Sequence, residues 1–185
     1  MNRRRGHNVH IGWWLVIAWV LWFWCGGNDY LTHNWFYRIE YRPLITHYAQ
    51  ANDLPPELVA AVVYTESRFT PDAESSRGAV GLMQLMPETA EWVAEQQGTT
   101  VHDLRDPEEN IRLGTWYLRY LRTRFTSPEM ALAAYNAGHG HVEDWLEAAE
   151  AARVPLSVEA IPFPETREFV KSVTERQAEY QIHWQ

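Results

Sequence analysis

The prolines of this chain constrain its fold more than any other feature, because six of them stand where segments with helical spacing begin. Proline has no backbone N–H and a φ fixed at about −65°, so it suits the first turn of a helix and breaks the interior. The sequence shows no alternating strand pattern of useful length and no internal repeat. We therefore predict an all-α fold with helices starting at Pro43, Pro56, Pro87, Pro107, Pro128 and Pro164.

Several residues beside these prolines have the chemistry of helix caps. Asp106 is followed three positions later by Glu109, a spacing typical of a capping box in which the glutamate reaches back to the capping residue. We expect Ser127 to cap the following helix and Asp53 to cap the helix at Pro56. After Asp106, residues suited to packing recur at steps of three and four and predict one buried helical stripe: Ile111, Gly114, Leu118, Leu121 and Phe125.

Three segments are rich in turn formers and are predicted to be irregular. Residues 70–82 read "TPDAESSRGAVGL" and form a loop between two helices. The sequence "HGH", residues 139–141, is interpreted as a solvated turn before a short helix over residues 142–152. A proline-rich loop then begins at Val154 and leads to the last helix.

The N-terminal part of the chain has the layout of an export signal or a membrane anchor. Three arginines, Arg3 to Arg5, precede an apolar run from Ile11 to Cys25 that is interrupted only by Gly12. We expect an uncleaved anchor at residues 11–27, a cytoplasmic basic head at residues 1–10 and a linker at residues 28–42. A cleaved signal, or a lipoprotein signal with Cys25 as the lipidated residue, remains an alternative.

The charge of the chain bears on its partners. With Arg3 to Arg5 set apart, 13 of the 16 basic residues face all 24 acidic ones, which leaves a formal net charge of −11 on the remainder. Such a surface excludes nucleic acid as a partner, because binding to phosphates requires clustered lysine and arginine. The eight histidines show no spacing typical of metal ligands. We expect no metal and no cofactor.

Glu66 breaks an otherwise apolar helix face in the sequence "PPELVAAVVYTESRF". It follows Val63 by three residues, Val62 by four and Val59 by seven, so it falls on their face. An ionised carboxylate on such a face is costly, and a raised pKa is the usual consequence. Two alternatives stay open on the pattern alone: a cation such as Arg68 pairs with Glu66, or the helix turns it to the surface.

Two further segments combine glycine or alanine with isolated polar groups. In "GAVGLMQLMP", residues 78–87, two glycines precede an apolar stretch that contains the amide of Gln84. In "AAYNAG", residues 133–138, Tyr135 and Asn136 end an alanine-rich helix. Either segment is compatible with a binding site or with an ordinary packed turn.

Taken together, these segments resemble the catalytic domain of the soluble lytic transglycosylase family, which has a lysozyme-like, goose-type fold. The resemblance covers residues 43–185 and rests on "ESRF", "GAVGLMQLMP", "DPEENIRLGTWYL", "ALAAYNAGHGHV" and "IPFPETREFV", in the order of the family. His139 and His141 depart from the pattern, since a proline or a basic residue is commoner at these positions in the family.

The resemblance implies cleavage of the β-1,4 bond between N-acetylmuramic acid and N-acetylglucosamine in peptidoglycan, outside the cytoplasmic membrane. The family forms a 1,6-anhydromuramic acid product with a single glutamate as acid and then base, and Glu66 matches that glutamate. A hydrolase of the lysozyme type and a non-catalytic wall-binding or assembly protein are the alternatives. The residues that match the saccharide-binding positions of the family are Ser75, Gln84, Met86, Tyr135, Asn136 and Glu165.

Overall fold

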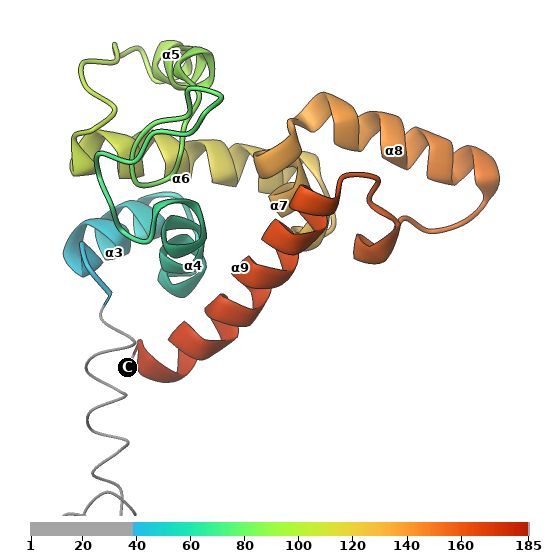
Figure 1. Ribbon diagram of the computed structural model, residues 1–185. Coiled ribbons are helices and arrows are strands. Elements are labelled where there is room, and N and C mark those ends of the chain that lie inside the picture. The colour runs from blue at the N-terminus through green and yellow to red at the C-terminus, as the bar shows by residue number, and fades with distance from the viewer. Residues whose placement is uncertain (1–38, 185) are drawn as a thin grey trace, which may run out of the picture. The chain divides into compact units, whose positions relative to one another are not determined.

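Helices account for almost all the regular structure of this protein (Figure 1). The computed structural model describes residues 39–184, and within them no strand forms beyond two isolated bridges, Glu74 with Val80 and Val80 with Leu85. The prediction of an all-α fold is confirmed. The helices are α3 (Arg42–Ala51), α4 (Pro56–Ser67), α5 (Pro87–Gln96), α6 (Pro107–Arg124), α7 (Pro128–Ala137), α8 (His139–Ala152), the 3₁₀-helix η2 (Val158–Ala160) and α9 (Pro164–His183).

The expected basic head, membrane anchor and most of the linker fall on residues 1–38, outside the described residues. Between residues 39 and 184, no helix has both the length and the hydrophobicity needed to cross a bilayer.

All six prolines stand in the first turn of a helix, as the sequence predicts. The Asp106 carboxylate accepts the Glu109 backbone N–H at 2.8 Å, and the Ser127 hydroxyl accepts the Met130 N–H at 3.3 Å. These caps satisfy backbone donors that the first turn of a helix leaves without partners. The five residues of the predicted stripe on α6 are all buried.

Two capping predictions are wrong. Asp53 does not cap α4, because it adopts a left-handed φ of 52° in the turn that ends α3, and Pro55 precedes the helix instead. Glu109 does not reach back to Asp106. Its carboxylate accepts the backbone N–H groups of His102 and Asp103, at 3.1 and 2.7 Å, and so holds the approach to α6.

The sequence "HGH" is also not a turn. Helix α8 begins at His139, directly after Gly138, three residues earlier than predicted. Gly138 has a φ of 91°, which side-chain-bearing residues avoid, and this one residue separates α7 from α8. The His141 ring lies against Trp145 and Phe163, with ring centroids 6.2 and 5.2 Å away.

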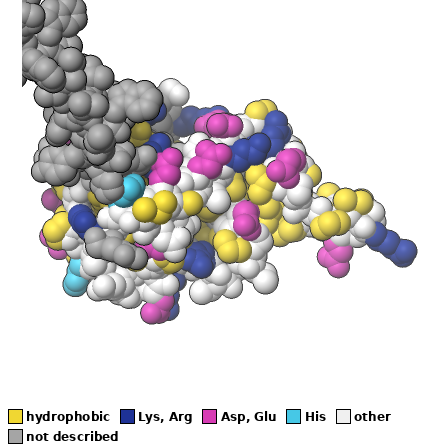
Figure 2. All heavy atoms as spheres, turned by 90° about the horizontal axis from the view of Figure 1, so that it is seen from below, with side chains coloured by type: hydrophobic (Ala, Val, Ile, Leu, Met, Phe, Trp, Pro, Cys, Tyr) yellow, Lys and Arg dark blue, Asp and Glu magenta, His cyan; other side chains and the backbone are white. Residues whose placement is uncertain are grey.

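Helix α4 lies at the centre of the fold. Residues 58–63 are buried without interruption, and α4 packs against α3 and α9, while α6 packs against α3, α5 and α7. The charged groups are left at the surface, and Figure 2 shows acidic and basic side chains intermingled on the face seen from below. Because exposed ion pairs contribute little to stability, the fold depends on the apolar packing around α4.

The loop between α4 and α5 is fixed by Asn110 of α6, which is fully buried. Its Oδ1 accepts the Met83 N–H at 2.7 Å, and its Nδ2 donates to the carbonyls of Val80 and Leu104, at 3.0 and 2.8 Å. Gly81 passes so close, with a φ of 85°, that a Cβ would overlap the Asn110 side chain and the Leu104 carbonyl. One side chain therefore holds three backbone positions of two loops.

We predict that Asn110→Ala lowers the free energy of unfolding by about 2–4 kcal/mol, because it leaves buried backbone groups without partners and creates a cavity. Urea denaturation at pH 7 measures the change. The exposed Gln96→Ala at the end of α5 serves as the control and should change stability by less than about 0.5 kcal/mol. A loss equal to that of the control would show that Asn110 does not hold the loop.

Candidate active site

Glu66 is the next-to-last residue of α4 and is half-buried. Burial raises the pKa of Glu66 to about 8, and the negative charge of Glu165 adds to the shift. The carbonyl end of the helix opposes a negative charge at this position as well. Across residues 39–184, no lysine, arginine or histidine lies within ion-pair distance of Glu66. The carboxyl group is therefore largely protonated at neutral pH.

Arg68 does not neutralise Glu66, so the alternative of an ion pair between them is wrong. The Arg68 guanidinium donates to the Tyr64 hydroxyl at 2.9 Å and lies 5.3 Å from the centre of its ring. Arg68 and Phe69 both have left-handed backbones, with φ of 52° and 62°. These conformations are uncommon for large side chains, and here they turn the chain sharply away just after Glu66.

Ser67 connects the end of α4 to the loop that follows. It is buried, and its hydroxyl donates to the carbonyl of Leu82 at 2.8 Å and approaches that of Val63 at 3.1 Å. The position of Glu66 is thus fixed relative to the loop by its immediate neighbour.

Gln84 and Ser75 both shape that loop. Gln84 has a φ of 46°, and its Nε2 donates to the carbonyls of Ala73 and Gly81, at 3.0 and 2.9 Å. These bonds use both amide hydrogens and leave Oε1 as the group with which Gln84 can accept from a ligand. The Ser75 hydroxyl accepts the Ala79 N–H at 2.9 Å, so it closes a tight turn.

Tyr135 lies close enough to Glu66 for the two to interact electrostatically. The Tyr135 hydroxyl donates to the Met83 carbonyl at 2.8 Å. Burial raises the pKa of Tyr135 well above its ordinary value, and the charges of Glu66 and Tyr117 raise it further. Tyr135 therefore stays protonated and acts as a hydrogen-bond donor at every pH at which Glu66 titrates.

Asn136 and Glu165 connect the site to α9. The Asn136 Oδ1 accepts the hydroxyl of the buried Thr166 at 2.7 Å, which joins the end of α7 to the first turn of α9. Glu165, one residue earlier, is exposed and forms an ion pair with Arg77 at 3.3 Å. The first turn of α9 thereby brings a negative charge near Glu66.

A cavity of about 200 Å³ opens among these residues. Four of the predicted site residues line it. Three do not line its wall: Glu66 lies at the end of α4, Ser75 in the loop and Glu165 on α9. Thr89 and Tyr117 also line it, and the sequence does not mark either of them. Tyr117 lies beside the apolar stripe of α6 and therefore resembles a core residue. The lining residues are Gln84, Leu85, Met86, Thr89, Tyr117, Tyr135, Asn136, Ala137 and Gly138.

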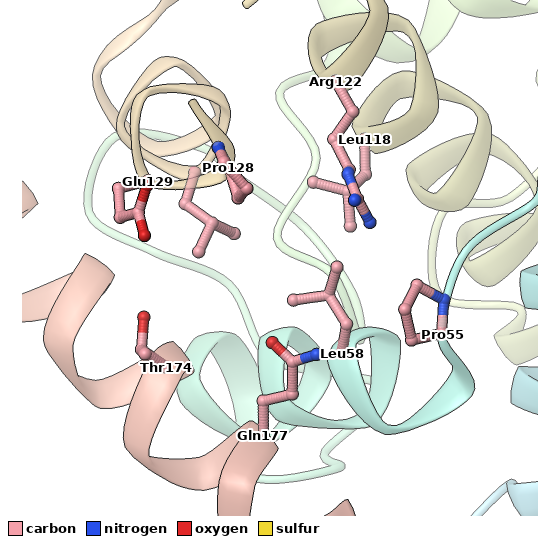
Figure 3. Close-up of a pocket in the computed structure, with 9 residues that line it drawn as sticks. Pro55, Leu58, Leu118, Arg122, Pro128, Glu129, Thr174 and Gln177 are labelled. Carbon is pink, nitrogen blue, oxygen red and sulfur yellow. The ribbon is translucent and has the colours of Figure 1, made fainter. Parts of the chain in front are cut away.

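A second cavity, of about 210 Å³, lies among α4, α6, α7 and α9 (Figure 3). Its acidic group is Glu129, which shares the cavity with Arg122, Thr174 and Gln177. A hydrogen bond from the Ser127 hydroxyl lowers the pKa of Glu129, so this carboxyl is ionised at neutral pH. It cannot act as a proton donor there, which leaves Glu66 as the better candidate for acid catalysis. Among residues 39–184, no three histidine, cysteine or acidic side chains are grouped as metal ligands.

A comparison with known families settles the relationship. The model of the transglycosylase SLT domain matches residues 43–154, more than half of the chain. The chain belongs to the transglycosylase SLT family. This membership confirms the resemblance that the five motifs indicate.

Known proteins resemble this SLT domain over most of its length. The soluble lytic murein transglycosylase of Salmonella typhimurium is 36% identical over an alignment of 188 residues. The alignment covers 96% of this chain and 28% of that protein. Membrane-bound lytic murein transglycosylase F of Desulfosudis oleivorans is 38% identical and covers 72% of this chain and 31% of the relative. The crystal structure of the 70 kDa soluble lytic transglycosylase of Escherichia coli matches with a TM-score of 0.75 and 34% identity, over 85% of this chain and 26% of that one. The chain spans less than a third of the length of each.

The raised pKa of Glu66 predicts a pH-dependent cost to stability. The pKa rises from an ordinary value of 4.5 to about 8 on folding, so the folded state binds the proton more tightly than the unfolded state. Stability contributed by the protonated group is complete below pH 4.5 and is lost as the pH rises to about 8. Glu66→Gln removes the titration, so the stability of the variant relative to the wild type should rise by about 4 kcal/mol as the pH goes from 5 to 9.

Urea denaturation of both proteins at pH 5 and pH 9 measures this difference, in which all other titrating groups cancel. The exposed Glu168→Gln, also a change from carboxylate to amide, serves as the control and should show no such gain. An equal difference between Glu66→Gln and wild type at both pH values would mean that burial does not perturb Glu66.

Proposed function

We propose that this SLT domain is a peptidoglycan lytic transglycosylase and that Glu66 is its single acid and base. The observation that supports this best is the Glu66 carboxyl, which is half-buried, has no cation partner within residues 39–184 and has a pKa raised to about 8. A carboxyl group that is still protonated at neutral pH can donate a proton to a glycosidic oxygen. The names of its relatives, lytic murein transglycosylases, support the same reaction class.

In the first step, protonated Glu66 donates its proton to the oxygen of the β-1,4 bond between N-acetylmuramic acid and N-acetylglucosamine. The bond from that oxygen to C1 of the muramic acid breaks, and N-acetylglucosamine leaves with a free hydroxyl group. The acetamido oxygen of the muramic acid stabilises the cationic C1, so no second carboxylate is needed.

In the second step, the Glu66 carboxylate removes the proton from the 6-hydroxyl of the same muramic acid. The oxygen of that 6-hydroxyl forms a bond to C1, which gives the 1,6-anhydro product. The proton that it gives up returns Glu66 to its protonated form. No water is consumed, so the reaction is not a hydrolysis. A pKa near the working pH suits a group that must both donate and accept a proton.

The other predicted residues hold the sugar. We propose that the Tyr135 hydroxyl, whose hydrogen is donated to the Met83 carbonyl, accepts a hydrogen bond near the reacting centre. Gln84 Oε1 and Asn136 contact polar groups of the saccharide. Met86 supplies an apolar wall, and Ser75 lies near the acetamido end of the reacting sugar. Glu165 lies outside the cavity wall and contributes through its charge, which helps to keep the pKa of Glu66 raised.

We further propose that residues 11–27 anchor the protein in the cytoplasmic membrane with residues 43–185 on the periplasmic side. The basic head before the apolar run supports this orientation. One relative, the transglycosylase F of Desulfosudis oleivorans, is described as membrane-bound. Peptidoglycan strands are then the partner within reach of the site.

We predict that Glu66→Gln lowers the release of muropeptides from purified sacculi by at least about 1,000-fold, because glutamine cannot transfer the proton. Mass spectrometry of the wild-type products should find 1,6-anhydromuramic acid ends. Products with reducing ends instead would show that the enzyme is a hydrolase of the lysozyme type. Equal release by the variant and the wild type would overturn the assignment of Glu66.

The charge of Glu165 gives a second test. Glu165→Gln removes a negative charge that raises the pKa of Glu66, so the alkaline limb of the kcat/KM profile should move to lower pH. Burial is the larger cause of the shift, so we expect a displacement of a few tenths of a pH unit, up to about one. Glu168→Gln, one turn along α9, is the matched control. A limb that stays in place, or moves to higher pH, contradicts the coupling between the two carboxyl groups.

A further inference from the structure

Three large aromatic side chains gather where α5 packs on α6. Trp92 comes from α5, and Trp116 and Tyr120 come from α6, with ring centroids 5.7 and 5.0 Å from that of Trp92. Trp116 and Tyr120 lie one helical turn apart with their rings nearly parallel, at 2° and 5.9 Å. All three side chains are half-buried, so each keeps part of its surface open to solvent.

This cluster continues the cavity of the candidate active site. Thr89 of α5 and Tyr117 of α6 line the cavity. Trp92 follows Thr89 by three residues and Tyr120 follows Tyr117 by three, so each lies on the same helix face as the residue it follows. The Trp92 ring is 6.3 Å from that of Tyr117, which in turn is 5.6 Å from that of Tyr135. A row of aromatic rings thus leads from Tyr135, which interacts with Glu66, through Tyr117 and Trp92 to Trp116.

Packing between α5 and α6 does not fully bury the outer rings. The side of α5 facing the core is made by Ala90, Val93 and Ala94, which are almost completely buried. Tyr117 is only 8% exposed, as expected of a core aromatic, whereas Trp92, Trp116 and Tyr120 each keep part of their surface exposed. Open aromatic surface that continues a lined cavity is typical of a ligand-binding groove.

The surrounding charges narrow the class of ligand. Aromatic rings bind flat apolar faces, which both nucleobases and the C–H faces of pyranose rings offer. Helix α5 exposes Glu88, Glu91 and Glu95, whose negative charges oppose a phosphate backbone. A neutral acetamido sugar fits both the rings and the charges.

We propose that Trp92, Trp116 and Tyr120 form an additional saccharide-binding surface, the aromatic platform, that holds sugars of the glycan strand beyond the cavity. This proposal rests on the proposed function, because it extends the same groove. Its consequence is a preference for length: strands that reach the platform bind more tightly than fragments that fill only the cavity.

Binding of N-acetylglucosamine oligomers to the full chain in phospholipid nanodiscs tests the platform. Glu66→Gln serves as the background, so that no oligomer is cleaved during calorimetric titration. Trp116→Ala and Trp92→Ala should each weaken binding of the hexamer by about fivefold or more and leave binding of the dimer unchanged within twofold. Trp92→Phe, which keeps an aromatic face, should restore most of the affinity.

Trp184→Ala is the matched control, a half-buried tryptophan that contacts Arg42 at the far end of α9 and should change neither affinity. Equal weakening for dimer and hexamer would overturn the proposal, since it would show that the tryptophans only support the cavity. Unchanged hexamer binding by folded Trp116→Ala would overturn it as well. The muropeptide assay distinguishes failure of the platform from failure of the proposed function. If anhydro products form but the hexamer binds no more tightly than the dimer, the proposed function stands and the platform is rejected.

Discussion

The buried hydrogen bonds that hold the loop between α4 and α5 determine the geometry of everything around Glu66. Asn110 fixes the backbone at Val80 and Met83, and Ser67 fixes it at Leu82, so α6 and α4 hold the loop from two sides. Tyr135 then donates to the Met83 carbonyl. Because buried polar groups are costly when unpaired, this network has few alternative arrangements, and it positions the cavity wall relative to α4.

Two glutamates show how local surroundings decide the chemistry of a carboxyl group in this fold. Glu66 stands at the end of a helix, no cation in the described part of the chain pairs with it, and burial raises its pKa to about 8. Glu129 stands in the first turn of α7, where the Ser127 hydroxyl lowers its pKa. The helix ends act in the same directions, since a helix start favours a negative charge and a helix end opposes it. Of these two glutamates, Glu66 is therefore the one that is protonated at neutral pH.

Much of the fold and of the candidate site could be predicted from the sequence, because proline and cap chemistry act locally. The six helix starts marked by prolines followed from proline and cap chemistry, and the face of Glu66 followed from spacing. The resemblance added the residues around the cavity. The predictions that were wrong concern residues whose contacts no local sequence pattern shows. Helix α8 begins at His139, and His141 contacts Trp145 and Phe163. Glu109 accepts loop N–H groups that no motif marks. The role of Asn110 and the exposure of Trp92 depend on neighbours far along the chain.

The protonation state of Glu66 is the central claim, and a direct titration tests it. Carboxyl carbons of glutamate labelled with ¹³C can be followed by NMR from pH 4 to pH 10 in the wild type, with Glu66→Gln used to assign the resonance. The account predicts a midpoint near 8 for Glu66. A midpoint near the ordinary value of 4.5 would contradict it, because the carboxyl would then be ionised at neutral pH with no proton to donate.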